Sequence, residues 1–139
     1  MSDPFDLKRF VEAQDMVWDD VRRELAAGQK QSHWMWYVFP QIAGLGFSPI
    51  SEHYAIASLD EARAYLAHPV LGPRLRHCTE LVNAVDGRPI GEILGSPDDL
   101  KFRSSMTLFS QVTEDNAVFW DALAKYYGGE TDRATLERM

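Results

Sequence analysis

The spacing of apolar residues constrains the fold of this chain most strongly, because they recur every three or four positions through successive short segments. The first segment shows this clearly, with apolar side chains from Leu7 to Leu25 following a period near 3.6 residues, which is typical of an amphipathic helix. Asp6 precedes the pattern as an N-cap, and Gly28 follows it as a left-handed stop. We therefore predict one helix from Leu7 to Leu25.

Proline and glycine divide the rest of the chain into further short helices. Ser48-Pro49 is a typical helix start, and Ser58 with Glu61 forms a capping box. His68-Pro69 ends that helix, and His68 is expected to contribute a cap or turn contact. Further starts are expected at Gly72-Pro73, Pro89, Ser96-Pro97, Asn116 and Thr131 or Asp132. No repeat or linker interrupts this pattern, so we predict an all-α fold, a compact multi-helical single domain over residues 1–139.

Composition narrows the classes of function. The 139 residues include 14 basic and 21 acidic side chains, and the net charge of −7 argues against general nucleic-acid binding. A single cysteine fits a reducing compartment, and the N-terminus lacks the features of a signal peptide. The longest apolar run, Trp34 to Phe39, is too short to span a bilayer. We therefore expect a soluble cytoplasmic protein without a membrane partner, and the sequence leaves its oligomeric state open.

The usual catalytic and metal-binding motifs do not appear. The four histidines never pair at helical spacing, so no metal site and no cofactor are predicted. Cys78 has no companion cysteine, and Gly44-Leu45-Gly46 is only half of a dinucleotide-binding fingerprint. Asp98 and Asp99 fall in the first turn of a predicted helix, where stabilisation of the helix dipole is their expected role.

The segment from Ser32 to Gln41 is the first candidate for a functional site, because it is aromatic on nearly every side. Periodicity alone does not separate a helix from a strand here, and we prefer a helix because no convincing strand partner lies nearby. In one interpretation the rings are core and His33 is a hydrogen-bonded structural residue. In the other, Trp34 or Trp36 stacks on a planar ligand, Gln41 orients it, and His33 acts as a general acid or base.

The segment from Asp98 to Phe109 is the second candidate, because it places hydroxyl groups inside a predicted helix. Ser105 falls on the apolar face of that helix, where an unpaired hydroxyl is costly. Close helix packing or hydrogen bonding to a carbonyl one turn earlier accounts for this without any function. Alternatively, charged groups and hydroxyls together form a patch that binds phosphate or carboxylate. The residues of this patch are Lys101, Arg103, Ser104, Ser105 and Thr107.

Both segments also carry a family resemblance. The chain resembles the Domain of Unknown Function 1810 family from about Phe10 to Leu136. The motifs that carry this resemblance are Ser32-His33-Trp34-Met35-Trp36, Phe39-Pro40-Gln41, Gly44-Leu45-Gly46, Tyr65-Leu66-Ala67-His68-Pro69 and Ser104-Ser105-Met106-Thr107-Leu108-Phe109.

The resemblance implies a compact, mainly α-helical domain that is widespread in bacteria, and it implies no established activity or cofactor. Some relatives carry the label calpastatin. The inhibitory regions of calpastatin are polar and disordered, whereas this chain is 45% hydrophobic, so we do not transfer that activity. A signature rich in His, Trp, Gln, Ser and Thr favours a polar site where the two segments meet.

We therefore hypothesise a site for a small planar anionic metabolite, such as a nucleotide derivative, with or without catalysis. In this hypothesis Trp34 or Trp36 stacks on the ligand, while Lys101 and Arg103 hold its anionic group. Its polar groups are oriented by Gln41, Ser104, Ser105 and Thr107, and His33 is the general acid or base. The alternative is a protein-interaction module without catalytic activity, in which exposed aromatic residues form the partner surface.

Overall fold

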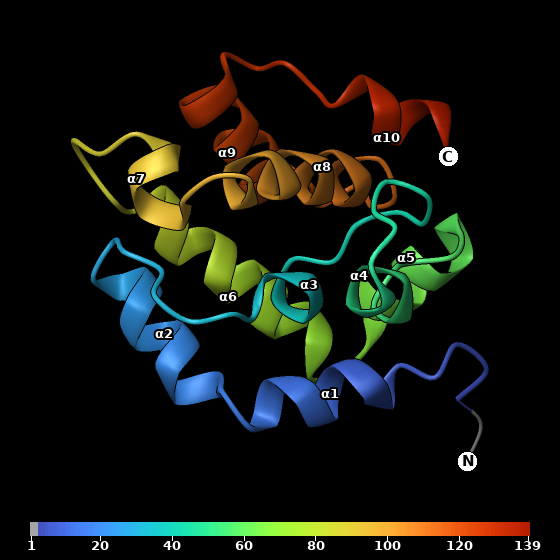
Figure 1. Ribbon diagram of the computed structural model, residues 1–139. Coiled ribbons are helices and arrows are strands. Elements are labelled where there is room, and N and C mark those ends of the chain that lie inside the picture. Colours follow the sequence, from blue (N-terminus) through green and yellow to red (C-terminus); the bar gives the residue numbers. More distant parts are fainter. Residues whose placement is uncertain (1–2) are drawn as a thin grey trace.

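The computed structural model describes residues 3–139 and contains, within that range, ten helices and no strand (Figure 1). The helices are α1 (Lys8–Asp15), α2 (Trp18–Ala26), α3 (Met35–Val38), α4 (Pro49–His53), α5 (Leu59–Ala67), α6 (Leu71–Asn83), α7 (Ile90–Leu94), α8 (Asp98–Ser110), α9 (Ala117–Tyr127) and α10 (Arg133–Glu137). The all-α prediction is therefore confirmed. None of the helices in this range combines the length and apolarity that a membrane crossing requires.

Several helix ends lie where local signals predict them. The Ser48 hydroxyl accepts the Ser51 N–H ahead of α4, and the Ser58 hydroxyl accepts the Glu61 N–H ahead of α5. The Nδ1 atom of His68 accepts the N–H groups of Val70 and Leu71 at the start of α6, as expected for a turn contact. These contacts span two to three residues, which is why the sequence alone reveals them.

The predicted first helix is in fact two helices, which is a correction. The chain turns at Met16 and Val17, between α1 and α2, and the Met16 side chain is 86% exposed. A straight helix over the same residues would be about 28 Å long, whereas the turn lets both halves face one core. Asp6 does not cap α1. Instead, the Asp3 carboxylate accepts the N–H groups of Leu7 and Lys8.

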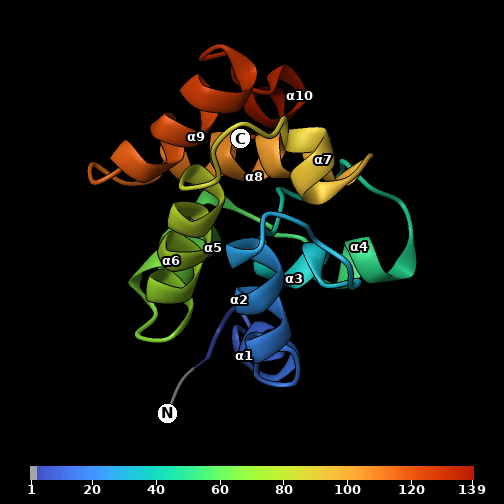
Figure 2. The same ribbon diagram turned by 90° about the vertical axis from the view of Figure 1, so that its left-hand side faces the viewer.

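The helices pack around one continuous cluster of buried apolar side chains. In both ribbon views α8, α9 and α10 lie in the upper part and α1 and α2 lie below, with α6 between them (Figures 1 and 2). α8 is central to the cluster. Its Phe102 ring contacts Phe39 at 4.9 Å between centroids, and its Phe109 ring contacts Tyr65 at 5.4 Å. α8 also packs against α9 and α10.

The segment that follows α3 is an irregular loop held in place by backbone hydrogen bonds. The Ile56 N–H donates to the Gln41 carbonyl oxygen and the Ala43 N–H donates to the Ile56 carbonyl oxygen, both at 2.8 Å. These bonds form an isolated parallel bridge between Ile42 and Ile56. The bridge fixes the backbone of Gln41, and the loop then crosses in front of α8 to reach α4 (Figure 1).

Candidate functional site

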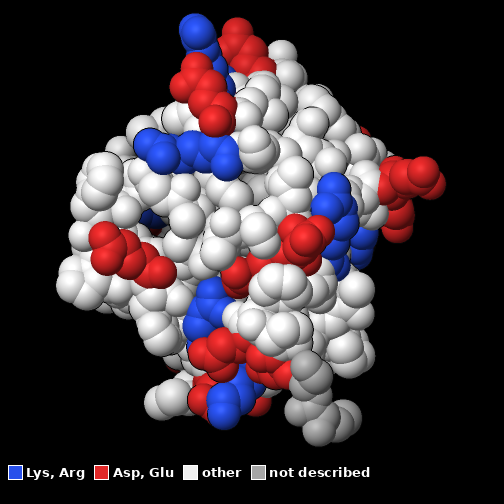
Figure 3. Space-filling view, turned by 90° about the vertical axis from the view of Figure 1, so that its right-hand side faces the viewer, with Lys and Arg blue, Asp and Glu red and all other residues white. Residues whose placement is uncertain are grey.

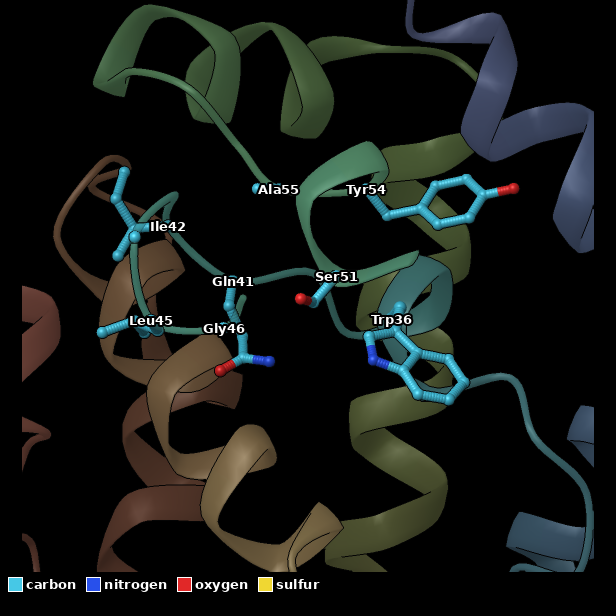
Figure 4. A pocket seen from close by; sticks show the side chains of 9 residues that line it. Trp36, Gln41, Ile42, Leu45, Gly46, Ser51, Tyr54 and Ala55 are labelled. Carbon is cyan, nitrogen blue, oxygen red and sulfur yellow. The ribbon is translucent and has the colours of Figure 1, made fainter. Parts of the chain in front are cut away.

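A groove of about 480 Å³ opens between the loop that joins α3 to α4 and the first turns of α8. Its lining residues are Trp36, Gln41, Leu45, Gly46, Phe47, Ser48, Ser51, Pro97, Leu100, Lys101 and Ser104. A small cavity adjoins it behind the same loop and shares Trp36, Gln41 and Ser51 with it (Figure 4). The groove therefore brings together four of the predicted site residues: Trp36, Gln41, Lys101 and Ser104.

Two positions of the loop require glycine, because neighbouring side chains lie where a Cβ atom would be. Gly44 has φ +97°, and the Arg138 guanidinium occupies the space beside it, with its Cζ atom 2.9 Å from where a Cβ would be. At Gly46 a Cβ would lie 2.7 Å from the Ser51 hydroxyl oxygen. The Gly44-Leu45-Gly46 motif thus shapes a tight loop over α4 and the end of the chain. It does not follow a strand, so it is not the turn of a dinucleotide-binding fold.

Three polar groups face the space behind the mouth of the groove. Figure 4 shows the Gln41 amide nitrogen pointing toward the edge of the Trp36 ring that carries its nitrogen, while the Ser51 hydroxyl points toward the Gln41 side of this space. The Ser51 hydroxyl donates to the Ser48 carbonyl oxygen at 2.9 Å. Within residues 3–139, neither the Trp36 indole N–H nor the Gln41 side-chain amide has a hydrogen-bond partner. Two donor groups therefore remain available to a ligand.

The charge of the groove comes from Lys101, whose ammonium is the one charged group among the lining residues. Its Nζ atom lies 4.7 Å from the centroid of the Trp36 ring and 3.4 Å from Asp98 Oδ1. Asp98 Oδ2 in turn pairs with the buried ammonium of Lys30 at 2.9 Å. Asp98 therefore does more than face the helix dipole. It fixes Lys101 over the indole and leaves ammonium N–H groups directed at the groove.

Trp34 lies outside the groove, although it was predicted as a stacking residue. It is fully buried, and its indole N–H donates to Glu24 Oε1 at 3.1 Å. The Glu24 carboxylate also accepts the N–H groups of Gln31 and Ser32 and the Ser32 hydroxyl. Burial opposes ionisation of Glu24, but these hydrogen bonds outweigh it and lower its pKa. Trp34 is therefore a core residue, in line with the first of the two interpretations of this segment.

Arg103 and Thr107 also lie away from the groove, where they hold the last part of the chain against α8. The Arg103 guanidinium donates to the Thr131 carbonyl oxygen at 2.8 Å. The Thr107 hydroxyl donates to the Arg103 carbonyl oxygen and accepts the Asp132 N–H at 2.9 Å. The Ser104 hydroxyl donates to the Asp132 carboxylate at 2.7 Å, so it lines the groove while already engaged. Packing of α10 accounts for most of this patch.

The remaining two predicted residues have no contact with the groove. Ser105 is fully buried on the core side of α8, and its hydroxyl has no hydrogen-bond partner in the described residues. The His33 side chain is exposed. Its backbone carbonyl oxygen accepts a hydrogen bond from the Tyr37 hydroxyl at 3.4 Å. The general acid or base role of His33 stays a prediction, and the histidine is not among the residues that line the groove.

Sequence reasoning missed the apolar side of the groove. Phe47 and Leu100 lie on its two rims and are 83% and 59% exposed. The adjacent Ile50 is 39% exposed. The available signal was Phe47 itself, a large aromatic residue that follows a glycine-rich loop and belongs to no periodic helix. Across residues 3–139, no group of three or more His, Cys, Asp or Glu side chains is placed to hold a metal ion.

Comparisons with known proteins agree on the family. The model of the family described as "Protein of unknown function (DUF1810)" matches residues 4–139. The crystal structure of the conserved hypothetical protein Rv1873 from Mycobacterium tuberculosis matches with a TM-score of 0.96 and 61% sequence identity, over 97% of this chain and 96% of that one. No protein with a curated description matches. The chain therefore belongs to the Domain of Unknown Function 1810 family, as its sequence motifs predict.

Proposed function

We propose that the groove between the loop from α3 to α4 and the start of α8 binds a small planar anion, such as a nucleotide derivative. The observation that carries this proposal is the chemistry of the lining. Lys101 is its one charged side chain, and the Trp36 N–H and the Gln41 amide are donors without a partner in residues 3–139. An anion at this place receives one charged and two neutral hydrogen-bond donors.

The body of the ligand has an apolar surface to pack against. Leu45, Phe47, Pro97 and Leu100 line the same groove, and a volume of about 480 Å³ is typical of sites for small molecules. Lys101 already covers one face of the Trp36 ring. The proposed role of Trp36 is therefore to hold the ammonium and to donate its N–H, while the apolar rims contact the planar body of the ligand.

The test is a thermal-shift panel of nucleotides, sugar phosphates and small carboxylates on three variants. A ligand present at 100 times its dissociation constant stabilises the fold by about 2.7 kcal/mol. Lys101→Met removes the charge, and Trp36→Phe removes the N–H while keeping an aromatic ring. Lys8→Met, at an exposed lysine that starts α1, is the matched control. We expect the shift to be lost in Lys101→Met, reduced in Trp36→Phe and retained in Lys8→Met.

Two results would refute the proposal. One is a panel in which no compound shifts the wild-type protein. The other is a ligand whose effect persists in Lys101→Met and Trp36→Phe, because that ligand binds elsewhere.

A protein-interaction module is the second candidate, favoured by the exposed apolar side chains at the mouth of the groove. Phe47, Ile50 and Leu100 are all more than a third exposed, and a partner would bury them together. In this case Phe47→Ser abolishes a complex that Lys101→Met leaves intact. Co-purification from cell extract with both variants as baits distinguishes the two functions, because a ligand site requires Lys101 whereas the complex does not.

A further inference from the structure

We infer that the groove selects ligands with a single negative charge over ligands with two or more. This inference rests on the proposed function, since it names the charge class of the anion that the same groove binds. It follows from three features: the small number of charges at the groove, their arrangement around Asp98, and the neutral character of the other donors.

The charges are arranged as two ammonium groups around one carboxylate. Asp98 Oδ2 lies 2.9 Å from Lys30 Nζ, and Asp98 Oδ1 lies 3.4 Å from Lys101 Nζ. The cluster therefore keeps one net positive charge. Lys30 is buried and does not line the groove, so a ligand reaches the cluster through Lys101.

No second cation of the lining is available to balance a second negative charge. The groove is lined by Lys101 and otherwise by uncharged residues. Arg138 packs against Gly44 on the loop but is not one of the lining residues. Arg103, which would have supplied a second charge, is engaged by the carbonyl oxygens of Glu130 and Thr131. A dianion would thus bring a second negative charge, balanced by no cation of the lining, close to Asp98 and into a protein with a net charge of −7. Acidic and basic side chains are interspersed on the face of the molecule that Figure 3 shows, without a large basic patch.

The neutral donors match a compact monoanionic group. The Trp36 N–H and the Gln41 amide contribute hydrogen bonds but no charge, so they strengthen binding of an oxyanion without favouring a higher charge. Together with Lys101 they can serve the two oxygens of a carboxylate or the two free oxygens of a phosphodiester. Among nucleotide derivatives, this favours those that carry a single phosphodiester charge over di- and triphosphates.

The experiment compares three probes that share a phenyl ring. Benzoate and methyl phenyl phosphate are monoanions at pH 8, whereas phenyl phosphate is a dianion there, because the second pKa of a phosphate monoester lies near 6. Titration calorimetry at fixed pH and salt gives the dissociation constant of each probe for the wild-type protein. We expect both monoanions to bind more tightly than phenyl phosphate, the diester by about fivefold or more.

Leu100→Lys adds a second positive charge to the groove, at an exposed position on its rim. We expect it to remove or invert the preference by tightening phenyl phosphate most. Lys101→Met abolishes binding of all three probes if they bind in the groove.

The outcomes separate this inference from the proposed function. If phenyl phosphate binds the wild-type protein more tightly than the diester, and Lys101→Met abolishes that binding, the charge preference is wrong while the groove remains a ligand site. If none of the three probes binds, the inference is overturned. The nucleotide panel then decides separately whether the groove binds any anion.

Discussion

Trp34 and Trp36 are two positions apart in the sequence and have different surroundings in the structure. Each indole ring lies under a lysine ammonium, Lys30 at 5.1 Å from the Trp34 ring centroid and Lys101 at 4.7 Å from the Trp36 ring centroid. Asp98 pairs with both lysines. The inner indole N–H is bound by Glu24, whereas the outer one has no partner in the described residues and faces a groove.

The difference teaches how to separate a residue that stabilises the fold from a candidate binding residue of the same type. Both rings have an aromatic face and a cation, so residue identity and charge do not distinguish them. The state of the N–H donor does. A buried donor that is satisfied by the protein stabilises the fold, whereas an accessible donor beside a cation is free to bind a ligand.

The largest effect is expected at the inner tryptophan. Trp34→Ala removes a fully buried ring and one hydrogen bond of Glu24, so the free energy of unfolding should fall by about 3–5 kcal/mol. Trp36→Ala, at a half-buried ring on the groove, should cost about 1 kcal/mol or less. Urea unfolding of both variants measures the difference. Equal losses would show that the two rings are both core residues.

Glu24→Gln should have the next largest effect, about 1–3 kcal/mol at pH 7, because it weakens hydrogen bonds from three residues to a charged acceptor. The effect depends on pH in a defined direction. Folding lowers the pKa of Glu24 below its ordinary value of 4.5, so its contribution is complete above that value and is lost as pH falls through the folded pKa.

Urea unfolding of the wild-type protein and Glu24→Gln from about pH 7 to pH 3 checks this prediction. The difference between the two proteins should be constant at neutral pH and shrink below about pH 4.5. A difference that grows on acidification would contradict the assignment of an ionised, hydrogen-bonded Glu24.

A smaller effect is expected at Thr107, which belongs to the docking of α10. Thr107→Val removes the acceptor of the Asp132 N–H and should lower the free energy of unfolding by about 1–2 kcal/mol. Thr131→Val is the control, because its hydroxyl has no partner in residues 3–139. Ligand-induced shifts should be the same in both variants and in the wild type. A loss of ligand binding in Thr107→Val alone would show that the Thr107 hydroxyl belongs to the ligand site.

The smallest effect is expected at His33, whose side chain is exposed. His33→Ala should change the free energy of unfolding by no more than about 0.5 kcal/mol and leave the ligand-induced thermal shift unchanged. If a turnover assay becomes available through a ligand from the panel, activity retained in His33→Ala would end its role as general acid or base. Activity lost with unchanged binding would establish that role.

The family, the helical class and several helix starts were predictable from the sequence. Four of the nine predicted site residues, Trp36, Gln41, Lys101 and Ser104, line the groove. The others were chosen for the same chemical reasons, but Trp34, Arg103 and Thr107 use their donors within the protein, Ser105 is buried in the core and His33 lies outside the groove. The Thr107 hydroxyl meets Asp132, 25 residues away, and Arg103 meets Thr131, 28 residues away. Neither contact has a local signal.

The sequence by itself determined what depends on neighbours within one helical turn: the helical periodicity, the Ser48 and Ser58 caps and the end of the second helix at Gly28. The tertiary structure alone decided the turn at Met16 and which tryptophan faces the groove. That choice depends on Glu24 of α2 and Lys101 of α8, which approach Trp34 and Trp36 from other helices. Periodicity gives each side chain a direction on its helix, but only packing decides whether that direction meets the core, another helix or solvent.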